Sequence, residues 1–159
     1  MPDDLYDRDI LAWSEREAAL LRRLARGERV NDVDWAHLVE AIEDVGLSER
    51  NAVRSCLERL LLHLLKLRLW PDDPSVRHWR TEAVAFQRSA ARRFAPSMRR
   101  RIDLDGLYRD AVDRLQAGRM EDEPALRPPE TCPFELDALL TEPWGRLETR
   151  AREAGQGWD

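Results

Sequence analysis

Lysine and cysteine are almost absent from this sequence. Lys66 is the only lysine among 26 basic residues, and Cys56 and Cys132 are the only cysteines. Two cysteines so far apart match no metal-binding spacing and provide no disulfide framework. We therefore expect a reduced, cytoplasmic protein that uses no cofactor and holds no metal.

Long apolar runs are also missing. No stretch approaches the ~20 apolar residues of a membrane span, and the most apolar run, at residues 60–65, lies between Arg59 and Lys66. The first residues, Met-Pro-Asp-Asp-Leu-Tyr-Asp, lack the apolar region of a secretory signal. These features argue against a membrane partner.

Glycine and proline are sparse before the C-terminal third, and no alternation of period two persists. Apolar residues instead recur every three or four positions, which is typical of amphipathic helices. The pattern predicts an all-α, single-domain bundle of about five helices around a long central Leu-rich helix. We place the bundle domain at residues 1–140 and a weakly anchored tail at residues 141–159.

Two helices are predicted before the central one. The first covers residues 5–26, stops at Gly27 and carries Glu17 on an otherwise apolar face. The second begins at Asp32 or Asp34 and stops at Gly46. Its apolar face, which we expect to be buried, comprises Trp35, Leu38, Val39, Ile42 and Val45.

The central helix is predicted over residues 49–70, with Ser48 as its cap and Pro71 after its end. Its apolar face includes Val53, Leu57, Leu60 and Leu64. Further helices are predicted near residues 75–94, from Asp103 to about Gly118, and after Pro133.

Charge is distributed unevenly along the chain. Residues 1–46 carry 12 acidic and 6 basic residues, a net −6; residues 47–101 carry 5 and 13, a net +8; residues 102–159 carry 14 and 7, a net −7. One interpretation is that acidic helices pack beside a basic one and neutralise it. The other is a basic surface for nucleic acid or another acidic partner.

Two motifs resemble a known family. They are Leu-Val-Glu-Ala-Ile-Glu-Asp-Val-Gly-Leu-Ser-Glu at residues 38–49 and Leu-Leu-His-Leu-Leu-Lys at residues 61–66. With Tyr6, Asp9, Trp13, Trp79 and the Cys-Pro-Phe at 132–134, they resemble the bacterial domain of unknown function family twenty-nine. The resemblance covers residues 5–140 and implies an all-helical fold, but no activity. It singles out Glu40, Glu43, Asp44, Gly46, Ser48, Glu49, His63 and Lys66 as motif positions.

The acidic motif residues have two interpretations. If the chain forms a hairpin near residue 47, Glu43 lies near Arg50 and Glu40 near Arg54, as ion pairs that fix its register. A metal site of Glu40, Glu43 and His63 is the alternative, but the hairpin would separate Glu40 from His63 by roughly 13 Å along the helix axis. We predict no metal ligand and no catalytic residue, since no nucleophile motif, phosphate loop or triad is present.

His63 and Lys66 belong to a narrow polar line on the central helix. The line comprises Ser55, Arg59, His63, Lys66 and Trp70. We expect His63 to bind a carboxylate or a backbone carbonyl, with acids of the first helix (Asp7, Asp9, Glu15, Glu17) or of the fifth (Asp110, Asp113) as candidate partners of the line. A general base is the alternative, because histidine titrates near neutral pH.

The most basic segment is residues 88–101. Its arginines, together with Phe94, fit either a solvated helix end or a phosphate-binding surface. The candidate nucleic-acid residues are Arg92, Arg93, Arg99, Arg100 and Arg101.

Three functional hypotheses follow. The first is a non-enzymatic helical domain that binds another macromolecule, an unidentified protein or a second copy in a homodimer. The second is a nucleic-acid-associated protein that uses the Arg88–Arg101 surface. The third is a metal-binding or hydrolytic protein centred on Glu40, Glu43 and His63.

Overall fold

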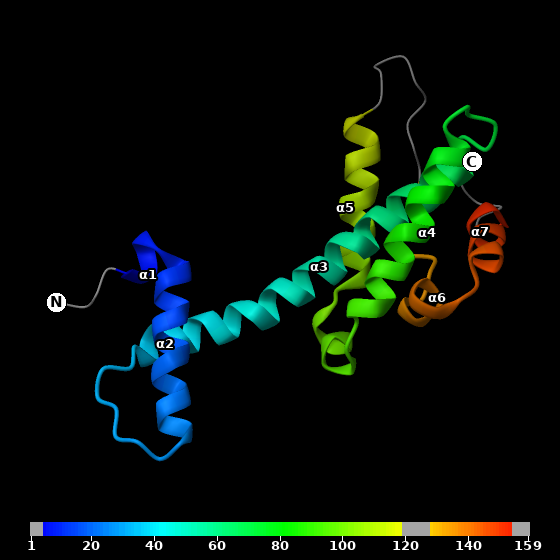
Figure 1. The fold of residues 1–159 in the computed structure, drawn as a ribbon. Coiled ribbons are helices and arrows are strands. Elements are labelled where there is room, and N and C mark those ends of the chain that lie inside the picture. The colour runs from blue at the N-terminus through cyan, green and yellow to red at the C-terminus, as the bar shows by residue number, and fades with distance from the viewer. Residues whose placement is uncertain (1–4, 119–127, 154–159) are drawn as a thin grey trace. The chain divides into compact units, whose positions relative to one another are not determined.

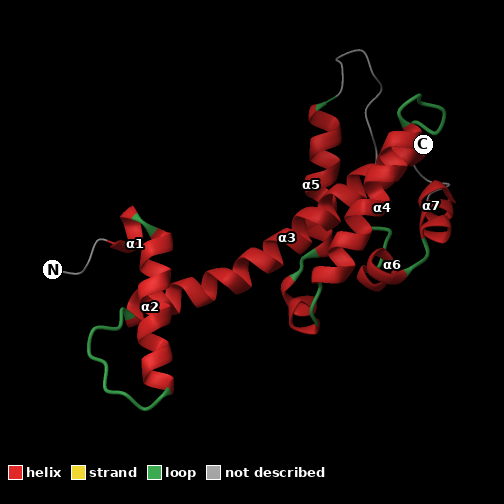
Figure 2. Cartoon of the chain, viewed as in Figure 1, coloured by secondary structure: helices red, strands yellow, loops and turns green. Residues whose placement is uncertain are grey.

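The chain forms two compact units in a computed structural model that describes residues 5–118 and 128–153. Unit 1 is Met1–Ser48 and unit 2 is Glu49–Asp159. The described residues contain helices and no strand, which confirms the predicted all-α class (Figure 2). In chain order these are α1 (Leu5–Arg8), α2 (Ile10–Ala25), α3 (Trp35–Leu69), α4 (Val76–Arg93), the 3₁₀ helix η1 (Pro96–Arg101), α5 (Leu104–Ala117), α6 (Leu136–Thr141) and α7 (Trp144–Glu153).

Unit 1 consists of α1, α2 and the first part of α3 (Figure 1). The predicted single helix over residues 5–26 is divided at Asp9. The side chain of Asp9 accepts a hydrogen bond from the Ala12 backbone N–H at 3.0 Å, and its φ of −152° leaves the helical region, so a new helix starts there. Gly27, at φ +82°, follows the end of α2 as predicted.

α3 is the long central helix, and the predicted break at Gly46 is wrong. Gly46 and Ser48 lie inside α3, so neither stops nor caps a helix. A glycine in a helix interior costs about 1 kcal/mol relative to alanine, which the helix-forming residues on either side can offset. Because the hairpin does not form, the predicted pairs Glu43–Arg50 and Glu40–Arg54 do not form within the chain.

The hydrophobic core of unit 2 surrounds the second part of α3. Val53, Leu57, Leu60 and Leu64 are fully buried, as the apolar pattern predicts. Figure 1 shows α4 and α5 beside this part of α3, with α6 and α7 next to α4. These helices contribute small and large apolar side chains to one cluster: Ala83, Ala90, Leu107, Tyr108, Ala111, Leu139, Leu140, Leu147 and Ala151.

The C-terminal segment differs from the expected weakly anchored tail. Residues 144–153 form α7, whose Leu147 and Ala151 are buried in the core of unit 2. The four positions between these two side chains place them on one helix face. Residues 154–159 of the expected tail lie outside the described part of the chain.

Candidate functional site

A polar cluster joins α1 and α2 to the start of α3 in unit 1. Trp13 Nε1 donates to Asp34 Oδ2 at 3.2 Å, and His37 Nδ1 lies 2.6 Å from the same oxygen. The Tyr6 ring stacks on the His37 ring at 4.2 Å between centroids. The hydrogen bond to His37 lowers the pKa of Asp34, and the bond to Asp34 raises the pKa of His37, so both favour their charged forms.

Glu17 also belongs to this cluster. Its place there explains why a glutamate lies on the otherwise apolar face of α2. Its side chain is only 1% exposed, and its Oε2 accepts the backbone N–H of Asp34 at 3.0 Å. Its Oε1 is buried without a hydrogen-bond partner among the described residues. Glu17 thus satisfies one of the free N–H groups at the start of α3 and ties α2 to it.

The apolar face of α3 in unit 1 is exposed, which contradicts the prediction that it is buried. Ile42 is 70% exposed, Val45 66% and Trp35 59%. Val39 is 54% exposed, whereas Leu38 is half-buried. We call Trp35, Val39, Ile42 and Val45 the open α3 face. It is uncovered because α1 and α2 contact α3 through Asp34 and His37, on the polar side of the helix.

Every residue of α3 from Ile42 to Ser48 is exposed. This segment includes the motif positions Glu43, Asp44 and Ser48, and Glu40 just before it is exposed as well. None of these acidic side chains makes an ion pair with another described residue. These motif residues therefore lie on the exposed part of α3, beside the open α3 face.

His63 lies in unit 2, in the contact between α3 and α4. It is 5% exposed, its Nε2 is 3.0 Å from Glu82 Oε2, and its ring stacks on Phe86. The expected carboxylate bond is present, but its acceptor is on α4. The candidate partners on the first and fifth helices are not used by His63. Its Nδ1 is buried without a partner among the described residues.

Three other residues of the polar line on α3 contact aromatic rings of α4. Lys66 Nζ lies 5.5 Å from the centre of the Trp79 ring, and Arg59 lies 5.5 Å from that of Phe86. Trp70 also contacts Trp79, at 6.4 Å between centroids. The line is thus matched by cation–π and aromatic contacts in addition to the carboxylate of Glu82.

The buried His63 predicts a pH dependence of the stability of unit 2. Burial, followed by the positive charge of Lys66, lowers the pKa of His63 below its usual 6.5, although Glu82 opposes the shift. Below about pH 6.5 the unfolded chain then binds more protons at this position than the folded chain. The stability that unit 2 gains from a buried, neutral His63 is therefore fully present above about pH 6.5, and it is lost as the pH falls below that value.

Urea denaturation of wild type and His63→Gln between pH 7.5 and 5.5 measures this effect. We expect the free energy of unfolding of wild type to fall more steeply on acidification than that of the variant. His37 is present in both proteins, so its opposite contribution cancels in the comparison. Parallel curves over this range would show that His63 is not linked to folding.

The structure does not gather the candidate metal-binding residues into a metal site, and it does not gather the candidate nucleic-acid residues into a nucleic-acid site. In the described part of the chain, no group of three or more His, Cys, Asp or Glu side chains could hold a metal ion. Two of the five candidate arginines form ion pairs: Arg93 with Glu49 at 2.9 Å and Arg99 with Asp137 at 2.7 Å. Arg92, Arg100 and Arg101 are exposed.

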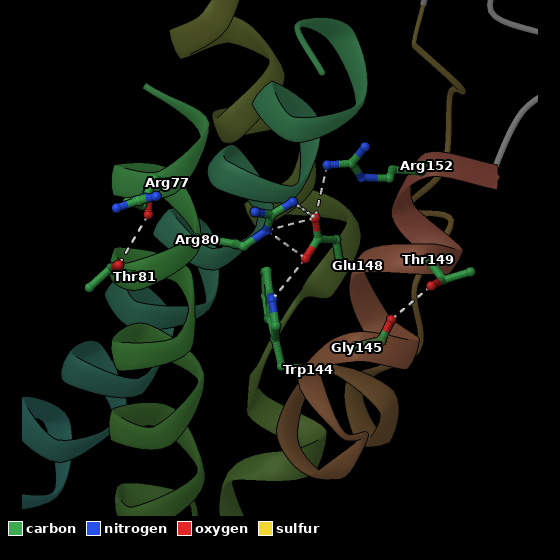
Figure 3. A network of polar contacts seen from close by, with 8 residues as sticks. All are labelled: Arg77, Arg80, Thr81, Trp144, Gly145, Glu148, Thr149 and Arg152. Carbon is green, nitrogen blue, oxygen red and sulfur yellow. Dashed lines mark hydrogen bonds and ion pairs between the residues drawn. The ribbon is translucent and has the colours of Figure 1, made fainter. Parts of the chain in front are cut away.

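A polar network between α4 and α7 is absent from the sequence-based predictions. Glu148 accepts hydrogen bonds from Arg80, Trp144 and Arg152 at 2.7–3.0 Å (Figure 3). Trp144, Glu148 and Arg152 recur every four residues, and this spacing is the signal that could have indicated a helix here. Arg80 and Trp144 also line a shallow groove of about 490 Å³ on unit 2.

These observations define an all-α protein built on one long central helix. The model of a family described as "Domain of unknown function DUF29" matches residues 5–145, so the chain belongs to this family. The resemblance inferred from the motifs is thereby confirmed.

One solved structure, an α-helical protein of unknown function from Rhodospirillum rubrum, is similar to this chain. The two are 28% identical, with a TM-score of 0.68, and the match covers 91% of this chain and 96% of the other. A search of curated proteins gave no match. No described helix is long and apolar enough to cross a membrane. The comparisons establish family and fold and assign no activity.

Proposed function

We propose that this protein is a non-enzymatic helical interaction domain, and that its open α3 face binds a second copy of the chain. The observation that supports the proposal is the exposure of Trp35, Val39, Ile42 and Val45 on one helix. Isolated apolar side chains on a surface are normal, whereas several together mark an interaction site.

Residues 42–48 of α3, which include Ile42 and Val45 of this face, gain little stability from packing within unit 1. Residues 42–48 are exposed throughout, and Gly46 has no atom within 4 Å of the position that a Cβ would occupy. An exposed helical segment with an interior glycine gains little stability from its own sequence. Contact with another molecule would stabilise it.

The size of the open α3 face agrees with a homodimer. Its side chains expose on the order of 500 Å² of apolar surface, which is about the size of the largest apolar patch on a typical monomer, and such a patch is often functional. Two copies in contact would bury on the order of 1,000 Å², close to the lower limit of a stable interface. The same face then serves both copies, as a two-fold axis requires.

Replacement of Ile42 by aspartate tests this proposal. The variant would place an unpaired charge in the centre of the contact, so we expect association to weaken at least about a hundredfold. Size-exclusion chromatography with light scattering measures the mass, and circular dichroism checks that the helices remain.

Leu11→Asp is the matched control. Leu11 is 66% exposed on α2 and does not belong to the open α3 face. We expect Leu11→Asp to associate like wild type. Loss of association in both variants, or in neither, would contradict a specific role for this face.

A further inference from the structure

We infer that the groove between α4 and α7 on unit 2 binds an acidic amphipathic helix of another protein. The inference does not depend on the proposed homodimer, because that contact uses the open α3 face of unit 1. Five of the residues that line the groove belong to α4, and one is the first residue of α7. The six are Arg80, Thr81, Val84, Ala85, Arg88 and Trp144.

The first argument is that the positive charge of α4 is only partly neutralised within the described chain. α4 contains five arginines and one glutamate, a net +4. Two of the arginines, Arg80 and Arg93, form ion pairs within unit 2. The other three, Arg77, Arg88 and Arg92, are exposed and form no ion pair with another described residue. Their charge is therefore available to an acidic partner.

The second argument is the arrangement of these three arginines. Arg77 and Arg88 are eleven residues apart, about three turns, and Arg92 follows one turn later, so all three lie along one side of α4. Val84 and Ala85, which line the groove, lie on the same side between Arg77 and Arg88. Arg88 and Arg92 are like charges four residues apart, an arrangement that destabilises a helix. A carboxylate of a bound partner would relieve this repulsion.

The third argument is the chemistry of the groove floor. Val84 and Ala85 are aliphatic, and the half-buried indole of Trp144 lines the same groove. Trp144 Nε1 donates to Glu148 at 3.0 Å, and this bond holds the ring in place (Figure 3). An apolar floor with arginines at its edge is complementary to a surface that is apolar in the middle and acidic at its margin.

A helix fits this groove better than an extended peptide or a nucleic acid does. The backbone groups in the middle of α4 are bonded within the helix, so the groove offers no sheet edge to an extended peptide. A bound helix satisfies its own backbone groups and presents only side chains. Single-stranded nucleic acid stacks its bases on aromatic rings, and only one of the six lining residues is aromatic.

Titration with two helical peptides tests the inference. The probe is an alanine-based helix of about fifteen residues, with leucines on one face and glutamates about three turns apart at the two ends of that face. The control peptide carries lysines in place of the glutamates. In NMR spectra of the labelled protein, we expect the glutamate peptide to shift the Trp144 indole N–H signal and the amide signals of Thr81 and Ala85. The lysine peptide should leave these signals unchanged, and equal shifts by both peptides would refute the inference.

Charge reversal at the edge of the groove measures the contribution of Arg88. We expect Arg88→Glu to bind the glutamate peptide on the order of tenfold more weakly than wild type. Arg101→Glu is the matched control, because Arg101 is exposed on η1 and does not line the groove. It should bind the peptide like wild type. Equal losses in the two variants would indicate a general effect of net charge and contradict a site in this groove.

Filling the groove separates its shape from its charge. Ala85→Arg adds a positive charge and a long side chain at an exposed position, and circular dichroism checks that the helices remain. We expect this variant to lose at least about tenfold in affinity for the glutamate peptide, whereas Ala85→Ser keeps the affinity of wild type. A single-stranded DNA oligonucleotide is the comparison ligand, because a phosphate-binding surface gains affinity from an added arginine.

Two results of these titrations would overturn the inference. One is an Ala85→Arg variant that binds the glutamate peptide as tightly as wild type does. The other is a wild-type protein that does not bind this peptide, whether or not it binds the oligonucleotide.

Discussion

Trp13→Ala is expected to unfold unit 1 and leave unit 2 folded. Trp13 is 3% exposed and is the only large apolar side chain that is buried in the described part of unit 1. Truncation of a buried tryptophan costs about 3–5 kcal/mol, and here it also removes the hydrogen bond to Asp34. Because the interior of unit 1 is so small, we expect this loss to exceed what its remaining contacts supply.

Amide hydrogen exchange resolves the two units. In Trp13→Ala we expect the amides of α2 to lose most of their protection, while those of α4 and α5 keep theirs. Trp35→Ala is the control, because the Trp35 side chain is 59% exposed. At concentrations where the protein is monomeric, the control should protect α2 as wild type does. Unchanged protection of α2 in Trp13→Ala would refute this account of unit 1.

Leu60→Ala is expected to destabilise unit 2 by about 2–5 kcal/mol, the range for leucine truncation in a packed core. Leu60 is fully buried on α3, within the cluster that joins α4, α5, α6 and α7. The surrounding helices can fill the resulting cavity only in part. Urea denaturation should show a lower midpoint with an unchanged slope.

Leu62→Ala is the matched comparison for Leu60→Ala. It makes the same chemical change two positions along α3, where the side chain is only half-buried. We therefore expect a clearly smaller loss of stability. Equal losses in the two variants would contradict the assignment of the Leu60 side of α3 to the core.

The sequence predicts the core of unit 2 well because its signal is strong and local. Val53, Leu57, Leu60 and Leu64 recur at helical spacing, and all four are fully buried. Local cues also locate helix ends where a side chain caps the backbone. Asp103 accepts from the Gly106 N–H at 2.9 Å and starts α5 as predicted.

The prediction from sequence fails where the structure depends on more than the nearest residues. Gly46 resembles a helix end, but helix propensity depends on the whole segment and α3 continues through it. The same periodicity that indicates a buried face at Leu57 also indicates one at Ile42. Periodicity shows that a face is apolar, and it cannot show whether the covering surface belongs to the same molecule.

The sequence predicts the chemical type of the group that binds His63, but not which residue carries it. Burial of a histidine on an apolar helix requires a hydrogen-bonding partner, and a carboxylate is one of the two expected kinds. The choice of Glu82 depends on which helix packs against that side of α3, and helix packing is not encoded in local spacing. The α4 aromatic residues Trp79 and Phe86 contact the same polar line.

Sedimentation equilibrium of the unmodified protein, over a wide concentration range, tests the central claim most directly. The chain has a mass of 18.6 kDa. If the open α3 face binds a second copy, the weight-average mass rises with concentration to twice this value and stops there, because a two-fold contact is closed. A mass that stays at one chain at all concentrations, or that rises without limit, would contradict the account.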